Sequence, residues 1–270
     1  MTRRRLDSEL VRRGLARSRE QAAELIGAGR VRVGGRTAEK AATQVETGAP
    51  IVVAAADTDP DYVSRGGHKL AGALAAFGDL DPKGRRCLDA GASTGGFTDV
   101  LLRAGAAQVV AVDVGYGQLA WSLRTDSRVT VVERLNIRDL GPEHVASPDT
   151  GELPSLVVAD LSFISLRLVL GPIQRSVTPD ADYVAMVKPQ FEVGKERVGA
   201  GGVVRDPMLR AAAVRDVAEY AGTLGLGVRG VTASPLPGPS GNVEYFLWLR
   251  AGTQPLNEDD LTRAITEGPQ

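Results

Sequence analysis

The pattern of hydrophobic and polar positions changes near residue 60, and the two parts of the chain predict different structures. Before that point the apolar runs are short and are often interrupted by glycine. The apolar spacing predicts a helix over Leu6–Arg13 that ends at Gly14. Ser18, with Gln21 three residues later, has the pattern of a capping box and predicts the start of a second helix.

Short strands are expected after these two helices. Arg30–Val33 alternates between polar and apolar residues, and Gly34-Gly35 after it predicts a hairpin turn. Ile51–Val53 predicts a further strand. We therefore expect a small α+β domain over residues 1–58 and a turn-rich interdomain linker over residues 59–63.

From residue 64 onward, apolar runs of strand length alternate with stretches of helical spacing. The expected strands are Arg86–Asp89, Val109–Asp113, Val129–Glu133, Ser155–Asp160, Tyr183–Val187, Val228–Ala233 and Tyr245–Leu249, and the expected helices include Phe97–Ala104, Leu166–Ser176 and Pro207–Leu224. This alternation predicts an α/β fold, a Rossmann-like, mostly parallel sheet with helices on both faces. The domain is expected to span residues 64–252, before a polar C-terminal tail (253–270) with one short helix capped at Asn257.

Charge is distributed unevenly along the chain. Residues 1–40 contain eleven Arg and Lys against five Asp and Glu, a net charge of about +6, and the formal total of −1 leaves about −7 for the rest. Such asymmetry indicates a basic arm that binds nucleic acid, with an ordinary solvated surface as the alternative. A single cysteine, Cys87, excludes an internal disulfide framework, and its place in a predicted strand indicates a small buried side chain. No run of eighteen apolar residues and no signal peptide are found, so we expect a cytoplasmic protein without a membrane span.

A glycine-rich loop after the first strand of the larger domain predicts a nucleoside cofactor site. Its residues are Asp89, Gly91, Ala92, Ser93, Thr94, Gly95, Gly96 and Phe97, and the loop opens a helix whose first amides can face a polar ligand. Ser93 occupies the position where dinucleotide sites need a second glycine close to a pyrophosphate. The loop therefore favours S-adenosylmethionine, which has no phosphate, over NAD or FAD. A glycine-rich turn without a ligand is the alternative.

The ends of the next two strands could complete that site. Asp113 stands 22 residues after Gly91, where a carboxylate can accept hydrogen bonds from both ribose hydroxyls, and Val114 follows it. Asn136, after the third strand, could contact the edge of the adenine, or it could be a solvent-facing loop residue. No metal site is expected.

Four charged residues are candidates for catalysis: Lys69, Asp160, Lys188 and Glu244. Asp160 and Lys188 end two predicted strands, and ligands of a parallel sheet bind beyond such carboxyl ends. A lysine in an apolar context needs a charged partner or loses proton affinity, so Asp160 would orient Lys188 and Lys69 would repel its charge. Glu244 would balance Lys69. For any one residue alone, a structural ion pair is an equal alternative.

Such a lysine could accept the proton of a ribose 2′-hydroxyl or stabilise the developing alkoxide during methyl transfer. Two other methylation chemistries are poorly supported. The segment Asp160-Leu161-Ser162-Phe163 lacks the proline pair that amino-directed methyltransferases place there, and the lone cysteine precedes the cofactor loop. The sequence therefore favours an oxygen acceptor.

Seven motifs together resemble the TlyA family of bacterial rRNA cytidine 2′-O-methyltransferases, sometimes labelled haemolysin A. They are residues 16–19, 29–33, 64–69, 89–97, 160–165, 188–192 and 237–244, so the resemblance covers nearly the whole chain. It implies an FtsJ/RrmJ-like methyltransferase domain whose Lys-Asp-Lys-Glu tetrad falls on the four charged residues. It also implies an N-terminal αL RNA-binding domain. RNA contacts are then expected from Arg3, Arg5, Arg17, Arg19 and Lys40, as phosphate contacts that carry no sequence code.

By this resemblance, the substrate is cytidine in large-subunit rRNA and, for longer members, also in small-subunit rRNA, and its methylation governs sensitivity to capreomycin-type antibiotics. The partner would be rRNA within ribosomal subunits; the oligomeric state stays open. Relatives carry Arg-Ala-Trp-Val between the domains, a linker tied to cofactor binding, where this chain has Pro60-Asp61-Tyr62-Val63. The alternative functions are a non-enzymatic RNA-binding assembly factor and a membrane-active haemolysin, and no stretch of the sequence supports membrane insertion.

Overall fold

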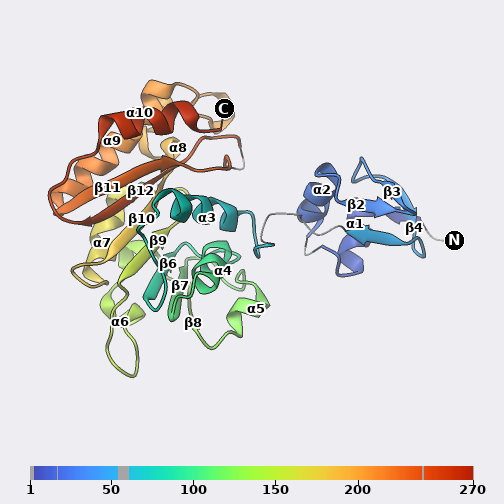
Figure 1. Ribbon diagram of the computed structural model, residues 1–270, viewed down its shortest axis with the longest axis horizontal. Helices are drawn as coiled ribbons and strands as arrows, with labels where there is room; N and C mark the ends of the chain where they lie inside the picture. The colour runs from blue at the N-terminus through green and yellow to red at the C-terminus, as the bar shows by residue number, and fades with distance from the viewer. Residues whose placement is uncertain (1–2, 17, 54–60, 239, 270) are drawn as a thin grey trace. The chain divides into compact units, whose positions relative to one another are not determined.

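Backbone hydrogen bonds sort the described strands into three separate sheets in the computed structural model (Figure 1). The structure describes residues 3–16, 18–53, 61–238 and 240–269. Two of the sheets are small and belong to the unit Met1–Asp61, and the seven-stranded sheet belongs to the unit Tyr62–Gln270. Each unit has a hydrophobic core of its own.

The N-terminal unit has the α+β character that its sequence pattern predicts. Its elements are β1 (Arg3–Arg5), α1 (Leu6–Arg12), α2 (Arg19–Gly27), β2 (Val31–Val33), β3 (Arg36–Thr37), β4 (Gln44–Glu46) and β5 (Ile51–Val53). Ser18 caps α2 by accepting a hydrogen bond from the Gln21 amide, as predicted. The pair β1 and β4 was not predicted, because the run of arginines in β1 does not alternate and becomes a strand only by pairing with residues about 40 positions away.

The C-terminal unit is built on the mostly parallel sheet that was expected. Its strands are β6 (Arg86–Ala90), β7 (Gln108–Asp113), β8 (Val129–Glu133), β9 (Leu156–Ala159), β10 (Asp182–Val187), β11 (Leu226–Ala233) and β12 (Tyr245–Ala251). They lie in the order β11-β12-β10-β9-β6-β7-β8, and β12 runs antiparallel to both of its neighbours. The strand order changes direction between β6 and β9, which is where ligands bind in open α/β sheets.

Helices cover both faces of this sheet. The α-helices are α3 (Gly66–Ala76), α4 (Gly96–Arg103), α5 (Trp121–Arg124), α6 (Pro142–Val145), α7 (Leu170–Arg175), α8 (Pro189–Glu192), α9 (Pro207–Thr223) and α10 (Glu258–Glu267), with short 3-10 helices at Ile137–Asp139, Leu166–Leu168, Lys195–Arg197 and Ala200–Gly202. Side chains of β10 alternate between two cores: Tyr183 joins the core under α7, α9 and α10, and Val184 joins the core under α3 and α4. Burial on both faces explains why this strand is a continuous apolar run.

Three helical segments differ from the sequence pattern. The helix expected over Leu166–Ser176 is divided into a 3-10 turn and α7, because Pro172 has no N–H to donate to the Leu168 carbonyl. Helix α3 was not predicted, since it starts with two glycines; a Cβ at Gly67 would lie 2.5 Å from the Tyr62 side chain. Helix α10, expected as a short helix in a polar tail, buries Leu261 in the core with α9 and β11.

We predict that Leu261→Ala lowers the free energy of unfolding of the C-terminal unit by about 2–5 kcal/mol, because the truncated side chain leaves a cavity in that core. Both tryptophans, Trp121 and Trp248, belong to this unit, so urea unfolding followed by tryptophan fluorescence measures its stability. The control is Thr262→Ala at the neighbouring exposed position of α10. Equal stability of both variants would mean that α10 contributes nothing to the packed unit.

Candidate active site

One edge of the seven-stranded sheet collects the charged residues that the sequence singled out. Asp160 directly follows β9 and Lys188 directly follows β10, so both stand at carboxyl ends of neighbouring parallel strands. Glu244 directly precedes β12, and because β12 is antiparallel its beginning lies at the same edge, beside the end of β10. Lys69 comes from the first turns of α3.

These four side chains form two ion pairs. The Lys188 Nζ lies 2.5 Å from the Asp160 Oδ1, and the Lys69 Nζ lies 2.6 Å from the Glu244 Oε2. The two lysine side chains are 9% and 10% exposed, and that of Glu244 is 1% exposed. Ammonium groups with so little access to water need such partners, because an isolated buried charge is costly. Sequence reasoning anticipated both pairings.

Lys188 has a second partner that sequence reasoning missed. Its Nζ donates a hydrogen bond to the Ser162 Oγ at 2.9 Å. Next to it Phe163 is 90% exposed, and its ring centroid lies 5.2 Å from that of Phe191 on α8. The exposure of this large aromatic residue, next in the chain to the serine that contacts Lys188, suggests a binding surface. The sequence alone does not show which aromatic residues are exposed.

The glycine-rich loop after β6 reaches this cluster. Gly91 has φ +91°, and a Cβ there would lie 2.7 Å from the Asp160 carbonyl oxygen. The close approach of the two backbones therefore requires glycine. The Asp160 amide in turn donates to the Ala90 carbonyl, which holds the loop and the catalytic candidate together.

Asp113 closes the loop from the next strand. Its two carboxylate oxygens accept hydrogen bonds from the amides of Ser93 (2.8 Å) and Gly115 (2.6 Å). Each oxygen keeps a lone pair for a further donor, so contact with ribose hydroxyls stays a prediction. Val114 is exposed beside it. The Asn136 side chain accepts from the Arg138 amide and caps a short 3-10 helix, and its contact with adenine stays a prediction.

The remaining loop residues have different environments. Asp89 is fully buried; one carboxylate oxygen accepts from the Thr98 hydroxyl, and the other has no hydrogen-bond partner among the described residues. Burial raises the pKa of Asp89 to about 7, against the lowering effect of the Thr98 hydroxyl. The Phe97 side chain is buried in the core against Phe246, so only its backbone can face a cofactor. Residues Ala92, Thr94 and Gly95 lie in the turn between β6 and α4, and Gly96 is the first residue of α4.

Residues with strained backbone conformations lie at the same edge of the sheet as the charged candidates. Non-glycine residues with positive φ are Ser93, Arg134 and Phe163, which follow β6, β8 and β9 respectively. Such conformations cost free energy and concentrate at functional sites. Of the residues described, these three lie in the loops where the cofactor and catalytic candidates are found.

The structure confirms the prediction that Cys87 is a small buried side chain. It is fully buried in β6, and burial raises the pKa of its thiol to about 12. A thiol with that pKa is protonated at neutral pH and cannot act as a nucleophile. In the described part of the chain no group of three or more His, Cys, Asp or Glu residues is arranged to hold a metal ion.

The expected RNA-binding residues of the N-terminal unit are only partly free. Arg5 and Arg19 both pair with Asp7, at 2.8 and 3.1 Å. Hydrogen bonds from Arg5 lower the pKa of Asp7, against the raising effect of burial. Arg3 and Lys40 are exposed. Arg17 lies outside the described residues.

The C-terminal end of the expected linker packs against the helices that carry the site. The Tyr62 ring lies over Gly67 and meets His68 edge-on at 5.1 Å. The Val63 amide donates to the Asp99 Oδ2 on α4 at 2.9 Å, and the Arg103 guanidinium lies 5.1 Å from the Tyr62 ring centroid. The aromatic residue of the linker is thus part of the packing between α3 and α4.

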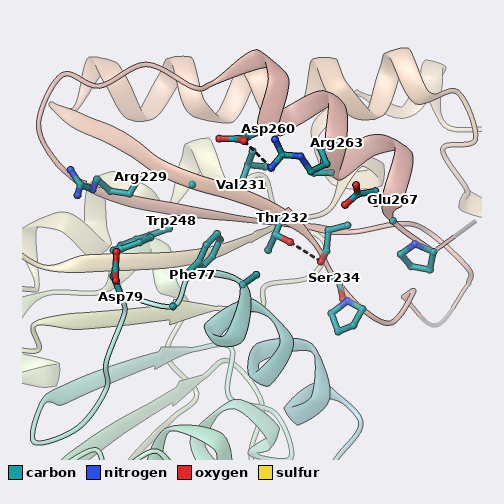
Figure 2. Close-up of a pocket in the computed structure, with 18 residues that line it drawn as sticks. Phe77, Asp79, Arg229, Val231, Thr232, Ser234, Trp248, Asp260, Arg263 and Glu267 are labelled. Atoms are coloured by element: carbon teal, nitrogen blue, oxygen red, sulfur yellow. Dashed lines mark hydrogen bonds and ion pairs between the residues drawn. The ribbon is translucent and has the colours of Figure 1, made fainter.

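A cavity of about 780 Å³ lies elsewhere in the same unit, along the edge strand β11 between α10 and the end of α3 (Figure 2). Phe77, Trp248 and Arg263 are among its lining residues, and none of the four charged candidates lines it. The candidate active site is therefore identified by its charged residues and by its place at the strand ends. It does not coincide with this cavity.

Comparison with known families gives two matches. The FtsJ-like methyltransferase family matches residues 62–251, and the S4 domain family matches residues 4–51. The first covers the sheet with all four charged candidates. None of the described helices is long and apolar enough to cross a membrane.

Individual relatives match over nearly the whole chain. The Mycobacterium tuberculosis protein named 16S/23S rRNA (cytidine-2'-O)-methyltransferase TlyA is 61% identical over 98% of both chains. The Bacillus subtilis protein YqxC is 41% identical over 97% of this chain and 93% of its own. A solved structure from Streptococcus thermophilus that carries the hemolysin label is 37% identical, covers 99% of this chain and 96% of its own, and has a TM-score of 0.76.

The raised pKa of Asp89 predicts a pH-dependent stability. Between about pH 4 and pH 7 the folded state holds a proton that the unfolded chain has released, so the free energy of unfolding falls as pH rises through this range, by a few kcal/mol. Asp89→Asn cannot ionise and should show a smaller fall. Urea unfolding of both proteins across this pH range measures the difference. The same pH dependence in both would mean that Asp89 is already ionised throughout.

Proposed function

The chain belongs to the FtsJ-like methyltransferase family, in its TlyA branch, and on this premise we propose that it methylates the 2′-hydroxyl of cytidine ribose in ribosomal RNA. The methyl donor would be S-adenosylmethionine. The observation that carries the proposal is the pair of lysine–carboxylate contacts at the strand ends, directly beside the glycine loop.

The residues of the loop fit the cofactor. Gly91 lets the loop lie against the Asp160 backbone, Asp113 retains lone pairs for ribose hydroxyls, and the buried Asp89 has an unpaired oxygen. When bound, S-adenosylmethionine supplies an electrophilic methyl group on a positively charged sulfur. No phosphate has to be accommodated, which agrees with Ser93 in place of a second glycine.

Lys188 is the residue that we propose acts on the acceptor. As an ammonium beside Asp160, Lys188 would stabilise the negative charge that develops on the 2′-oxygen; as a neutral amine, it would accept the proton that the 2′-hydroxyl releases. Asp160 keeps the lysine oriented. Glu244 holds Lys69 in the same way, which places a second cation at this edge of the sheet.

The exposed Phe163 gives the same edge an apolar face. A nucleotide that enters the site must leave its base stack, and an exposed aromatic ring can replace part of the lost stacking. The neighbouring Phe191 supports the ring from α8. We propose that the base of the target nucleotide rests there.

Ribosomal RNA is proposed as the substrate on two grounds. The M. tuberculosis relative, 61% identical, is named for cytidine-2'-O methylation of 16S and 23S rRNA, and the S4 domain supplies an RNA-binding unit. Its exposed basic residues would contact phosphates and position the methyltransferase unit. The partner would be a ribosomal subunit, and the place of action the compartment that contains ribosomes.

A non-enzymatic RNA-binding role is not favoured. It would leave unexplained why two buried lysines, each costly to desolvate, are retained with their carboxylates beside an intact glycine loop. A membrane-active role is not favoured either, since none of the described helices could span a bilayer.

We predict that Lys188→Ala lowers the rate of rRNA methylation by at least about 100-fold, because the acceptor hydroxyl loses its proton acceptor and charge partner. Radiolabelled S-adenosylmethionine with unmodified ribosomal subunits measures the rate, and reverse-transcription stops at low nucleotide concentration locate the methylated ribose. RNA binding should remain.

The matched control is Lys83→Ala, which changes a lysine before β6, at the opposite end of the sheet. That variant should keep the wild-type rate. Full activity of Lys188→Ala would remove the proposed role of Lys188. Binding to subunits with no methyl transfer by the wild-type protein would favour the assembly factor instead.

The exposed basic residues of the N-terminal unit predict salt-dependent binding. We expect Arg3→Ala with Lys40→Ala to weaken subunit binding and to reduce the slope of log K against log salt by about 0.7–0.9 for each phosphate that the variant no longer neutralises. Filter binding across a salt series measures this slope. Arg229→Ala, an exposed arginine on β11, is the control. An unchanged slope in the double variant would exclude these two residues from the RNA interface.

A further inference from the structure

We propose that Ser162 is a positioning residue that aims the Lys188 amino group at the acceptor hydroxyl. This inference rests on the proposed function and adds a residue to it. Ser162 lies outside the four charged candidates, and its only described link to them is the hydrogen bond that its Oγ accepts from the Lys188 Nζ at 2.9 Å.

The geometry at Lys188 needs more than one anchor. A lysine side chain has four rotatable bonds, and a single contact with Asp160 would allow the Nζ to swing around the carboxylate. The Asp160 Oδ1 lies 2.5 Å from the Nζ as an ion pair, and the Ser162 Oγ accepts a hydrogen bond from the same Nζ at 2.9 Å. The hydrogen bond is directional, so it adds a second fixed point that orients the amino group.

The loop that carries Ser162 is itself held in place. The buried Glu192 on α8 accepts hydrogen bonds from the Ser165 hydroxyl at 2.6 Å and from the Leu166 amide at 2.8 Å. Phe163 adopts φ +64° directly after Ser162, a conformation that persists only when the surroundings enforce it. The loop after β9 and the helix after Lys188 are therefore joined at both ends of the loop.

The serine hydroxyl also has an unused proton. Since its oxygen accepts from Lys188, its own O–H is free to donate, and no acceptor for it is found among the described residues. Exposed Phe163 follows it in the chain. The residue with the unused hydroxyl proton therefore lies next in the chain to the ring on which we propose that the base rests.

The test compares Ser162→Ala with Ser162→Thr, which keeps the hydroxyl. We expect Ser162→Ala to lower the single-turnover methylation rate at saturating RNA and S-adenosylmethionine by about tenfold to a hundredfold, since small misplacements of a reacting group have effects of that size. Its affinities for subunits and for S-adenosylmethionine, and its melting temperature, should match the wild type. Ser162→Thr should stay within about threefold of the wild-type rate.

A matched control is Ser147→Ala, which removes a buried serine hydroxyl from the loop before β9, at the other end of the sheet. It should methylate at the wild-type rate. A Ser162→Ala rate equal to wild type, a loss confined to binding affinity, or a Ser162→Thr variant as slow as Ser162→Ala would each overturn the inference and leave the proposed function standing. Absence of methyl transfer by the wild-type protein would overturn the proposed function, and this inference with it.

Discussion

The cost of burying an ammonium group without a partner is the constraint on which the C-terminal unit depends. Two lysines lie at the edge of its sheet with little access to water, and each is accompanied by a carboxylate within 2.6 Å. Asp160 and Lys188 can meet because β9 and β10 are parallel neighbours, and Glu244 joins them because β12 runs antiparallel. The single antiparallel strand in the described sheet is thus what brings a late glutamate to the same edge as residues that end parallel strands.

The loop that follows β6 is adapted to the same edge. Gly91 allows the loop to approach the Asp160 backbone, and Asp113 at the end of β7 holds the loop by accepting a hydrogen bond from the Ser93 amide. Among the described residues, the non-glycine residues with left-handed conformations, Ser93, Arg134 and Phe163, all lie in loops that follow strands of this sheet. A cofactor and an acceptor nucleotide would therefore meet a surface whose backbone is already held in place, as catalysis by electrostatic preorganisation requires.

In the N-terminal unit, too, buried charged residues are paired with residues of opposite charge. Two of its acidic residues, Asp7 and Glu9, are buried and bind neighbouring arginines, so part of the basic charge in this segment maintains the fold. Hydrogen bonds from Arg12 lower the pKa of Glu9 to about 2, against the raising effect of burial, so these contacts persist at neutral pH. Counting arginines therefore overstates the charge available to RNA. The exposed Arg3 and Lys40 are the more direct candidates for phosphate contacts.

The sequence by itself determined the α/β class, the position of every strand of the large sheet, the glycine loop and the identity of the four charged candidates, because apolar runs, glycine turns and charges at strand ends are local patterns. It failed where local pattern and structure disagree: helix α3 begins with two glycines, and β1 is a run of arginines. The sequence anticipated the pairing of Lys188 with Asp160 and of Lys69 with Glu244, but only the tertiary structure decided that these residues meet, the second pair across 175 positions, and that Lys188 also reaches Ser162. Those choices depend on strand order and on which helix lies over which strand, and such long-range contacts leave no periodic trace in the sequence.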